Sequence, residues 1–92
     1  MYYIYALYSE KFDRLYVGMT NNLKRRIYEH NIGKMKATSA CRPWLLFYWE
    51  LASDRINARK REKQLKSGSG REFLKSRLEV APVAQSDRAT AF

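Results

Sequence analysis

The sequence predicts a mixed fold of the α+β class, because strand-like and helix-like segments alternate along one short chain. Ninety-two residues allow one domain with one modest hydrophobic core, which we assign to residues 1–80. The segments rich in strand-forming residues are 2–8, 15–18 and 44–51. The segments with helical periodicity or helix-capping residues are 23–32, 54–66 and 71–78.

The first strand is expected to lie in the centre of a sheet. Residues 2–8, Tyr-Tyr-Ile-Tyr-Ala-Leu-Tyr, are apolar or aromatic on both alternating faces, as suits a strand covered on each side. The polar stretch 9–14 is turn-like, so the strands that flank it should form a hairpin. Residues 19–22 are expected to be loop, and the third strand, 44–51, is again apolar on both faces.

The first helix should begin after Asn22, a good N-cap, and end at Gly33. Four residues at i, i+3, i+4 and i+7 share one helical face, and they are Leu23, Arg26, Ile27 and His30. Because the two apolar residues of this face must pack on the sheet, Arg26 and His30 are carried toward the protein body. Three residues are expected to point elsewhere, namely Lys24, Arg25 and Glu29.

The second helix, capped by Ser53 or Asp54, also carries a charged residue on its apolar face. Its inward positions are Ala58, Glu62 and Leu65, spaced at i, i+4 and i+7. The stretch 67–70, Ser-Gly-Ser-Gly, is expected to end this helix. The apolar side of the third helix, 71–78, is formed by Phe73, Leu74 and Leu78.

The charge balance favours a polyanionic partner. The chain has 18 Lys and Arg against 9 Asp and Glu, a net charge of +9. A field of this sign favours nucleic acid, although the alternative is that the charge serves only solubility. The candidates for phosphate contacts are Lys24, Arg25, Lys34, Lys36, Arg59, Lys63 and Lys66.

The sequence lacks the features of disulfide-bonded proteins, cysteine-based zinc proteins and membrane proteins. Cys41 is the only cysteine, so an intrachain disulfide and a cysteine-based zinc site are both excluded. No apolar run has the length of a membrane span, and the chain opens without a signal-like segment. We therefore expect a cytoplasmic protein without a membrane partner. From Ala81 the composition changes, and residues 81–92 are expected to form a flexible tail outside the core.

Arg26 and Glu62 each allow two interpretations. A guanidinium matches phosphate oxygens, but an inward Arg26 could also snorkel or form an internal salt bridge with Glu62. A single carboxylate such as Glu62 suffices for Mg²⁺, which keeps most of its waters and takes substrate phosphate as a further ligand. The alternative is that Glu62 pairs with one of the many basic groups around it.

His30 and the strand tyrosines are ambiguous in the same way. His30 could assist proton transfer or bind phosphate, but a lone histidine on an apolar helix face is more often a hydrogen-bonded core residue. Tyr5 and Tyr16 lie on neighbouring expected strands, where tyrosines usually pack. A tyrosine acts as a base near neutral pH only where nearby positive charge or metal-bound water lowers its ordinary pKa of about 10.

Taken in order, these residues resemble the GIY-YIG nuclease family. The first motif reads Tyr3-Ile4-Tyr5 in place of Gly-Ile-Tyr, and the second reads Tyr16-Val17-Gly18. The helix with Arg26 and His30 resembles the arginine helix of the family, and residues 58–66 resemble its glutamate helix. The resemblance covers about residues 1–78 and is to the small stand-alone bacterial type, similar to the N-terminal nuclease domain of the bacterial excision-repair nuclease.

This resemblance implies a three-stranded antiparallel sheet flanked by helices. It also implies an endonuclease, dependent on Mg²⁺ or Mn²⁺, that hydrolyses DNA rather than RNA, in repair, recombination or mobile-element processing. Tyr5 or Tyr16 would act as the base on water, Arg26 would hold the scissile phosphate with help from His30, and Gly18 would keep the site open. Glu62 would hold the metal, which would stabilise the phosphate and the departing 3′ oxygen.

The chain departs from the family pattern at three places. Tyr3 replaces the first glycine, Met19 stands where some relatives have a lysine, and residues 67–70 stand where some carry Lys-Trp, with no asparagine following Glu62. The rival function is a non-catalytic nucleic-acid-binding module that retains the fold, and a third is a structural protein of a basic ribonucleoprotein. Which tyrosine is the base, which DNA structure is cut, whether a partner protein targets the domain and its oligomeric state stay open.

Overall fold

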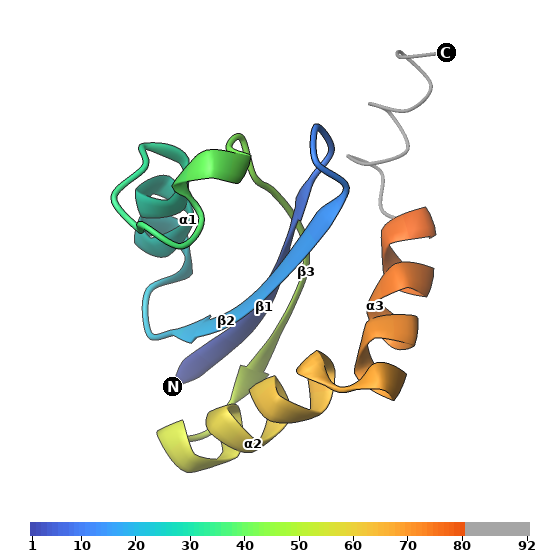
Figure 1. Ribbon diagram of the computed structural model, residues 1–92. Helices are drawn as coiled ribbons and strands as arrows, with labels where there is room; N and C mark the ends of the chain where they lie inside the picture. The colour runs from blue at the N-terminus through green and yellow to red at the C-terminus, as the bar shows by residue number, and fades with distance from the viewer. Residues whose placement is uncertain (81–92) are drawn as a thin grey trace.

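The computed structural model describes residues 1–80 and has an α+β fold, as the sequence predicts (Figure 1). The three strands are β1 (Tyr2–Ser9), β2 (Arg14–Thr20) and β3 (Leu45–Ala52). The helices are α1 (Leu23–Asn31), α2 (Arg55–Lys66) and α3 (Gly68–Val80), with a 3-10 turn, η1 (Ser39–Cys41). The expected tail, 81–92, lies outside the described residues.

The strands form one antiparallel sheet in the order β2-β1-β3. The central position of β1 is confirmed, because its residues from Ile4 to Ser9 are all buried. The hairpin of β1 and β2 is also confirmed, and its register sets Tyr5 opposite Gly18 and Leu7 opposite Tyr16. Met19 and Thr20 were expected in a loop, but both pair with β1 and extend β2.

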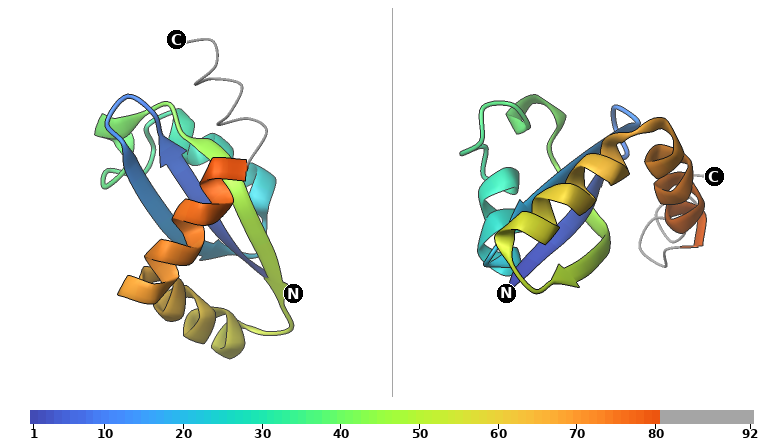
Figure 2. Two further views of the ribbon diagram at one scale, coloured as in Figure 1. Left: turned by 90° about the vertical axis from the view of Figure 1, so that its right-hand side faces the viewer. Right: turned by 90° about the horizontal axis from the view of Figure 1, so that it is seen from below.

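Helix α1 covers one face of the sheet, and α2 and α3 cover the opposite face (Figures 1 and 2). On the α2 and α3 side, the buried core consists of Ile4, Ala6, Val17, Ala58, Leu65 and Leu74. On the α1 side, Tyr5, Leu7 and Trp44 are buried, and Leu23 and Ile27 of α1 pack against them. The alternation of β1 side chains therefore supplies both cores, as the two apolar faces of its sequence indicate.

The prediction that β3 is apolar on both faces holds for its composition but not for its burial. Trp49 is 50% exposed and Leu51 is 49% exposed. Because β3 is an edge strand of the sheet, alternating apolar residues on it do not require cover on both sides.

The helix-capping signals are confirmed in detail. The backbone N–H of Arg25 donates to Oδ1 of Asn22 at 3.1 Å, and the N–H of Asn57 donates to Oδ1 of Asp54 at 2.8 Å. Gly33 has a φ of +84°, a conformation that favours glycine and ends α1. No helix within residues 1–80 is both long enough and apolar enough to span a bilayer.

The third helix begins earlier than the sequence predicts. The break after α2 is confined to Ser67, and Gly68 to Gly70 already belong to α3. The N–H of Gly70 donates to Oγ of Ser67 at 3.3 Å, which stabilises this first turn. A Cβ at Gly70 would clash with the carbonyl oxygen of Gln64 and with the backbone of Leu65. Only a glycine therefore allows α3 to start this close to α2.

Candidate active site

The two motif tyrosines share one face of the hairpin, beside a glycine that leaves room for both. Tyr5 pairs with Gly18 across the ladder, and the ring centroids of Tyr5 and Tyr16 are 6.3 Å apart. A Cβ at Gly18 would lie 2.6 Å from the Tyr5 hydroxyl oxygen and 3.0 Å from Cε2 of Tyr16. The glycine of the second motif is thus required by close contact and not by its backbone conformation.

His30 joins α1 to the hairpin through hydrogen bonds on both of its ring nitrogens. Its side chain is fully buried, and Nε2 lies 2.8 Å from the Tyr5 hydroxyl. Nδ1 lies 2.8 Å from the hydroxyl of Thr38, in the loop before η1. The His30 ring also stacks edge-on against Tyr16, with centroids 4.9 Å apart. The prediction that α1 carries His30 inward is therefore confirmed.

The direction of these bonds follows from the Thr38 end of the network. The Thr38 hydroxyl donates to the backbone carbonyl of Met35 at 3.3 Å, so its oxygen is free to accept a hydrogen bond from Nδ1–H of His30. Nε2 is then unprotonated and accepts a hydrogen bond from the Tyr5 hydroxyl. This arrangement holds His30 as a neutral imidazole and uses the Tyr5 hydroxyl as a donor.

Electrostatics support neutral forms of both groups. Burial, reinforced by the neighbouring Tyr16, raises the pKa of Tyr5 well above its ordinary value; Arg26 opposes the shift, and Glu62 and Glu29 add to it. Burial lowers the pKa of His30, Arg26 lowers it further, and Glu29 opposes both. The charges of Arg26 and Glu62 thus act on the pKa of Tyr5 in opposite directions, and burial outweighs both.

Arg26 lies at the border of this cluster with its side chain 30% exposed. Its Nη1 contacts the sulfur of Met35 at 3.2 Å and lies 3.6 Å from Oε1 of Glu29. Glu29 was expected to point elsewhere, but its side chain is only 15% exposed, because Arg25, Arg26 and Lys34 surround it. The internal Arg26–Glu62 salt bridge that the sequence allowed does not form.

Glu62 lies on the inward side of α2, as its helical phase predicts, with a side chain 14% exposed. Its carboxylate is paired with Nζ of Lys66 at 3.2 Å and, less closely, with Nε of Arg59 at 3.7 Å. Residues 1–80 contain no cluster of three His, Cys, Asp or Glu side chains that could hold a metal by themselves. The Glu62 carboxylate is an oxygen donor of the kind that hard divalent cations bind, with water and substrate oxygens as their further ligands.

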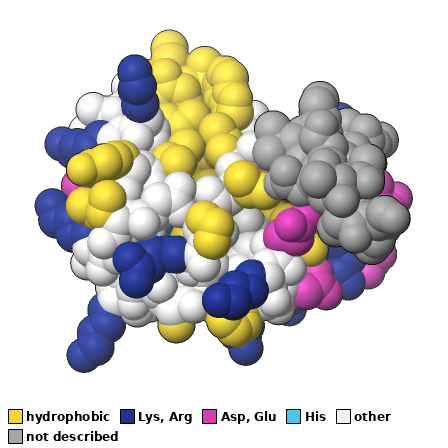
Figure 3. Space-filling model, turned by 90° about the horizontal axis from the view of Figure 1, so that it is seen from above, with side chains coloured by type: hydrophobic (Ala, Val, Ile, Leu, Met, Phe, Trp, Pro, Cys, Tyr) yellow, Lys and Arg dark blue, Asp and Glu magenta, His cyan; other side chains and the backbone are white. Residues whose placement is uncertain are grey.

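The predicted phosphate-contacting residues divide into two groups. Lys34, Arg59 and Lys66 pair with the carboxylates of the candidate site, and Arg25 pairs with Glu29 at 3.9 Å. The remaining candidates, Lys24, Lys36 and Lys63, are simply exposed. On the face drawn in Figure 3, basic side chains are widely distributed and acidic ones gather at one side.

Thr38 and Glu29 are the site residues that sequence reasoning missed. Thr38 is buried and fixes the His30 tautomer, and its backbone carbonyl also accepts the indole N–H of Trp44 at 2.8 Å. No sequence signal could have identified this threonine, because its contact depends on how an irregular loop returns to α1. A signal for Glu29 existed in its i,i+3 and i,i+4 spacing from Arg26 and Arg25.

The part of the chain that contains this cluster matches a known protein family. Residues 1–75 match the model of the GIY-YIG catalytic domain. A UPF0213 protein of Staphylococcus haemolyticus is 39% identical over 75 residues, which cover 80% of this chain and 90% of that protein. A UPF0213 protein of Syntrophus aciditrophicus is 40% identical over 75 residues, which cover 78% of this chain and 84% of that one.

A solved structure agrees with these sequence matches. The solution NMR structure of the UPF0213 protein BH0048 from Bacillus halodurans matches this fold with a TM-score of 0.52 and 29% sequence identity. The match covers 94% of each chain. The arrangement of sheet and helices is therefore shared with small stand-alone bacterial proteins.

Proposed function

Since the chain belongs to the GIY-YIG family, a family of nucleases, we propose that it is a metal-dependent endonuclease that hydrolyses DNA phosphodiester bonds. The observation that carries this proposal is the packing of Tyr5, Tyr16 and His30 around Gly18, with the partly exposed Arg26 on the same helix as His30 and the inward Glu62 on α2. A cation for phosphate, a carboxylate for a metal and two phenols are the groups that phosphodiester hydrolysis requires. Repair, recombination or mobile-element processing would be the setting.

We assign proton transfer from the attacking water to Tyr16. Its side chain is half-buried, and its hydroxyl makes no hydrogen bond to another residue within 1–80, so it is available to a water molecule. Tyr5 is only 1% exposed, and its hydroxyl is engaged with His30. In this assignment Tyr5 and His30 are positioning residues, which hold the Tyr16 ring through the aromatic contacts of the hairpin.

Arg26 is assigned to the scissile phosphate. Its guanidinium is partly exposed, and its contacts to a thioether and to Glu29 at 3.6 Å leave donors for phosphate oxygens. Charge that develops on the phosphate during attack would be stabilised by this fixed cation, an effect typically worth about 10²–10³-fold in rate.

Glu62 is assigned to hold Mg²⁺ or Mn²⁺. The metal, when bound, would act as a Lewis acid on the phosphate and the leaving oxygen. Lys66 and Arg59 now neutralise the Glu62 carboxylate, and both side chains are more than half exposed, so they can turn to DNA phosphates when the metal takes their place. The same ion pairs favour one alternative, a nucleic-acid-binding module in which Glu62 only organises basic side chains.

A cleavage assay with matched variants tests the proposal. Supercoiled plasmid and branched DNA are incubated with Mg²⁺ or Mn²⁺ and the wild-type protein, Glu62→Gln or Arg26→Gln. Both variants should lose cutting and keep the wild-type melting temperature. The matched controls Glu72→Gln and Arg55→Gln, both at exposed helical positions, should cut like wild type.

Wild-type-like cutting by Glu62→Gln and Arg26→Gln would contradict the assignment. DNA binding by the wild type, without cleavage of any substrate under either metal, would support the binding module instead.

A further inference from the structure

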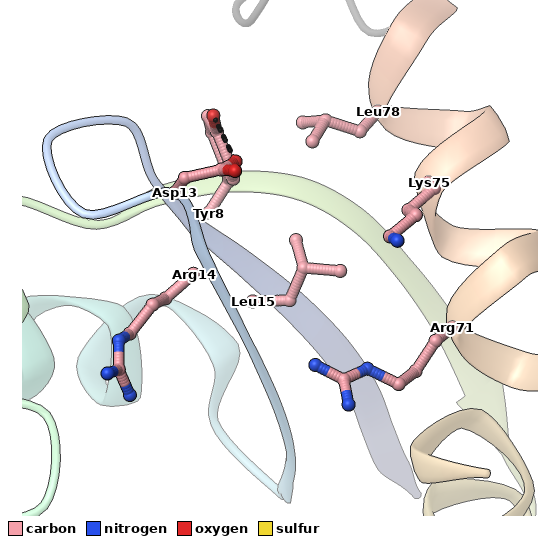
Figure 4. A pocket seen from close by; sticks show the side chains of 7 residues that line it. All are labelled: Tyr8, Asp13, Arg14, Leu15, Arg71, Lys75 and Leu78. Atoms are coloured by element: carbon pink, nitrogen blue, oxygen red, sulfur yellow. Dashed lines mark hydrogen bonds between the residues drawn. The ribbon is translucent and has the colours of Figure 1, made fainter. Parts of the chain in front are cut away.

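A groove separates the hairpin from α3 on the side of the sheet opposite α1. It has a volume of about 330 Å³ and is lined, among others, by Leu15, Leu78, Arg71 and Lys75 (Figure 4). In Figure 4, Arg71 and Lys75 extend from α3 toward β2, while Tyr8 and Asp13 meet at the far end. Two leucines therefore line the groove together with the two cations of α3.

The charges of these two side chains are not neutralised by ion pairs within residues 1–80. Arg71 and Lys75 are exposed, and neither forms an ion pair with a residue within 1–80. Arg77, on another side of α3, lies over the rings of Tyr48 and Phe73 and is engaged there. The one acidic side chain of the groove, Asp13, accepts a hydrogen bond from the Tyr8 hydroxyl, with 3.0 Å between the two oxygens. The groove thus presents net positive charge to an anion.

The groove continues toward the candidate active site. A second hollow, of about 350 Å³, is lined by Tyr16, Lys66, Leu15 and Arg71, so the two hollows share the last two residues. Lys66 also pairs with the Glu62 carboxylate at 3.2 Å. A line of basic groups therefore leads from the Tyr16–Glu62 region, through Lys66 and Arg71, to Lys75.

The spacing of this line suits a nucleic-acid backbone. Arg71 and Lys75 are four residues apart on α3, so they are separated by about 6 Å along the helix axis. Two steps along one strand of duplex DNA advance about 6.8 Å. Two cations at this spacing match phosphates that are two nucleotides apart on the same strand.

Resting on the proposed function, we infer that the groove formed by β2 and α3, with Arg71 and Lys75, is a DNA backbone subsite that binds phosphates flanking the scissile one. It positions the strand whose scissile phosphate lies at Tyr16 and Arg26. Because the contacts are to phosphates, the subsite contributes affinity and register without base recognition.

The salt dependence of binding tests this subsite separately from catalysis. Fluorescence anisotropy with a labelled DNA duplex in EDTA gives the dissociation constant at several NaCl concentrations, for wild type and Arg71→Ala/Lys75→Ala. Loss of two phosphate contacts should reduce the slope of log affinity against log salt by about 2. The control Arg55→Ala/Lys60→Ala removes the same charge from exposed positions of α2 outside both hollows and should keep a near wild-type slope.

The outcomes distinguish this inference from the proposed nuclease activity. An unchanged slope for the Arg71/Lys75 variant, an equal change in the control, or no DNA binding by the wild type would overturn the subsite, whatever the cleavage assay gives. A reduced slope in a protein that cuts no DNA would support the subsite and contradict the nuclease. In a protein that does cut, the variant should raise KM more than it lowers kcat, because neither residue touches the reacting phosphate.

Discussion

The tyrosine side of the candidate site is buried and closed by hydrogen bonds, whereas the glutamate side is held by ion pairs near the surface. Tyr5 and His30 are 1% and 0% exposed, and each ring nitrogen of His30 has a partner at 2.8 Å. The partners of Glu62, Arg59 and Lys66, are instead 56% and 54% exposed. One side is preorganised by burial, and the other can exchange its exposed ion-pair partners without unfolding of the protein.

The largest effect expected from this comparison is that of Tyr16→Phe on catalysis. Loss of the hydroxyl that we assign to proton transfer from water should slow cleavage by roughly 10²–10⁴-fold. Stability should change little, because this hydroxyl has no hydrogen-bond partner within residues 1–80. Rates of plasmid nicking with Mg²⁺ and thermal unfolding measure both quantities, and Tyr28→Phe, at a 64% exposed position, is the control. Full activity of Tyr16→Phe would transfer the role to another group.

Gly18→Ala should displace the side chains of both tyrosines. The new Cβ would lie within 3.0 Å of both rings, so the hairpin or the tyrosines must shift, at a cost of about 1–3 kcal/mol. The free energy of unfolding in denaturant and the cleavage rate should both fall. Gly68→Ala is the matched control, because a Cβ there meets nothing within 4 Å. Equal stabilities of the two variants would show that the hairpin accommodates the methyl group.

Tyr5→Phe should lower the free energy of unfolding, whereas Tyr16→Phe should leave it nearly unchanged. It leaves the buried Nε2 of His30 without its partner at 2.8 Å, which should cost about 1–3 kcal/mol of unfolding free energy. Urea unfolding of both tyrosine variants under the same conditions measures the difference. The comparison of the two hydroxyls fails if Tyr16→Phe proves to be the more destabilised protein.

Burial of His30 should also make the free energy of unfolding depend on pH. The pKa of His30 is lowered in the folded state, so the unfolded chain binds the proton first as pH falls. Unfolding free energy should therefore be constant above the ordinary pKa of about 6.5 and decline from there down through the lower folded-state pKa. His30 is the only histidine of the chain, so His30→Gln should lack this decline. A wild type with constant stability across this window would argue against a buried neutral imidazole.

The smallest effect is expected on the exposed side. Lys66→Gln removes an ion pair whose basic partner is 54% exposed, and such pairs contribute about 0–1 kcal/mol. The unfolding free energy of this variant in urea should therefore lie close to that of wild type. A larger loss would mean that the glutamate side is as rigid as the tyrosine side.

Helical period and capping signals predicted much of this arrangement. The spacing of Leu23, Ile27 and His30 placed α1 correctly, and Asn22 and Asp54 cap the helices that they were expected to cap. These signals are local, so the chain encodes them within one or two turns. The family resemblance added the three-stranded antiparallel sheet, which no local pattern contains.

The contacts made by irregular backbone could not be predicted in the same way. Thr38 reaches His30 only because the loop after α1 folds back, and no spacing rule describes such a return. Glycines at 68 and 70 suggested a loop, since glycine weakens helices, but the close packing of α3 on α2 overrides that preference. Propensity describes a residue alone, and these positions are decided by their neighbours.

The tight junction between α2 and α3 at Gly70 also determines the distance between two basic side chains. Lys66 ends α2 and Arg71 lies in the first turns of α3, so the distance between these two cations depends on how closely the helices meet. Any side chain at position 70 would push α3 outward, because it would collide with the backbone around Gln64 and Leu65. A residue without a side chain and without charge thereby fixes the spacing of two positive charges on the surface.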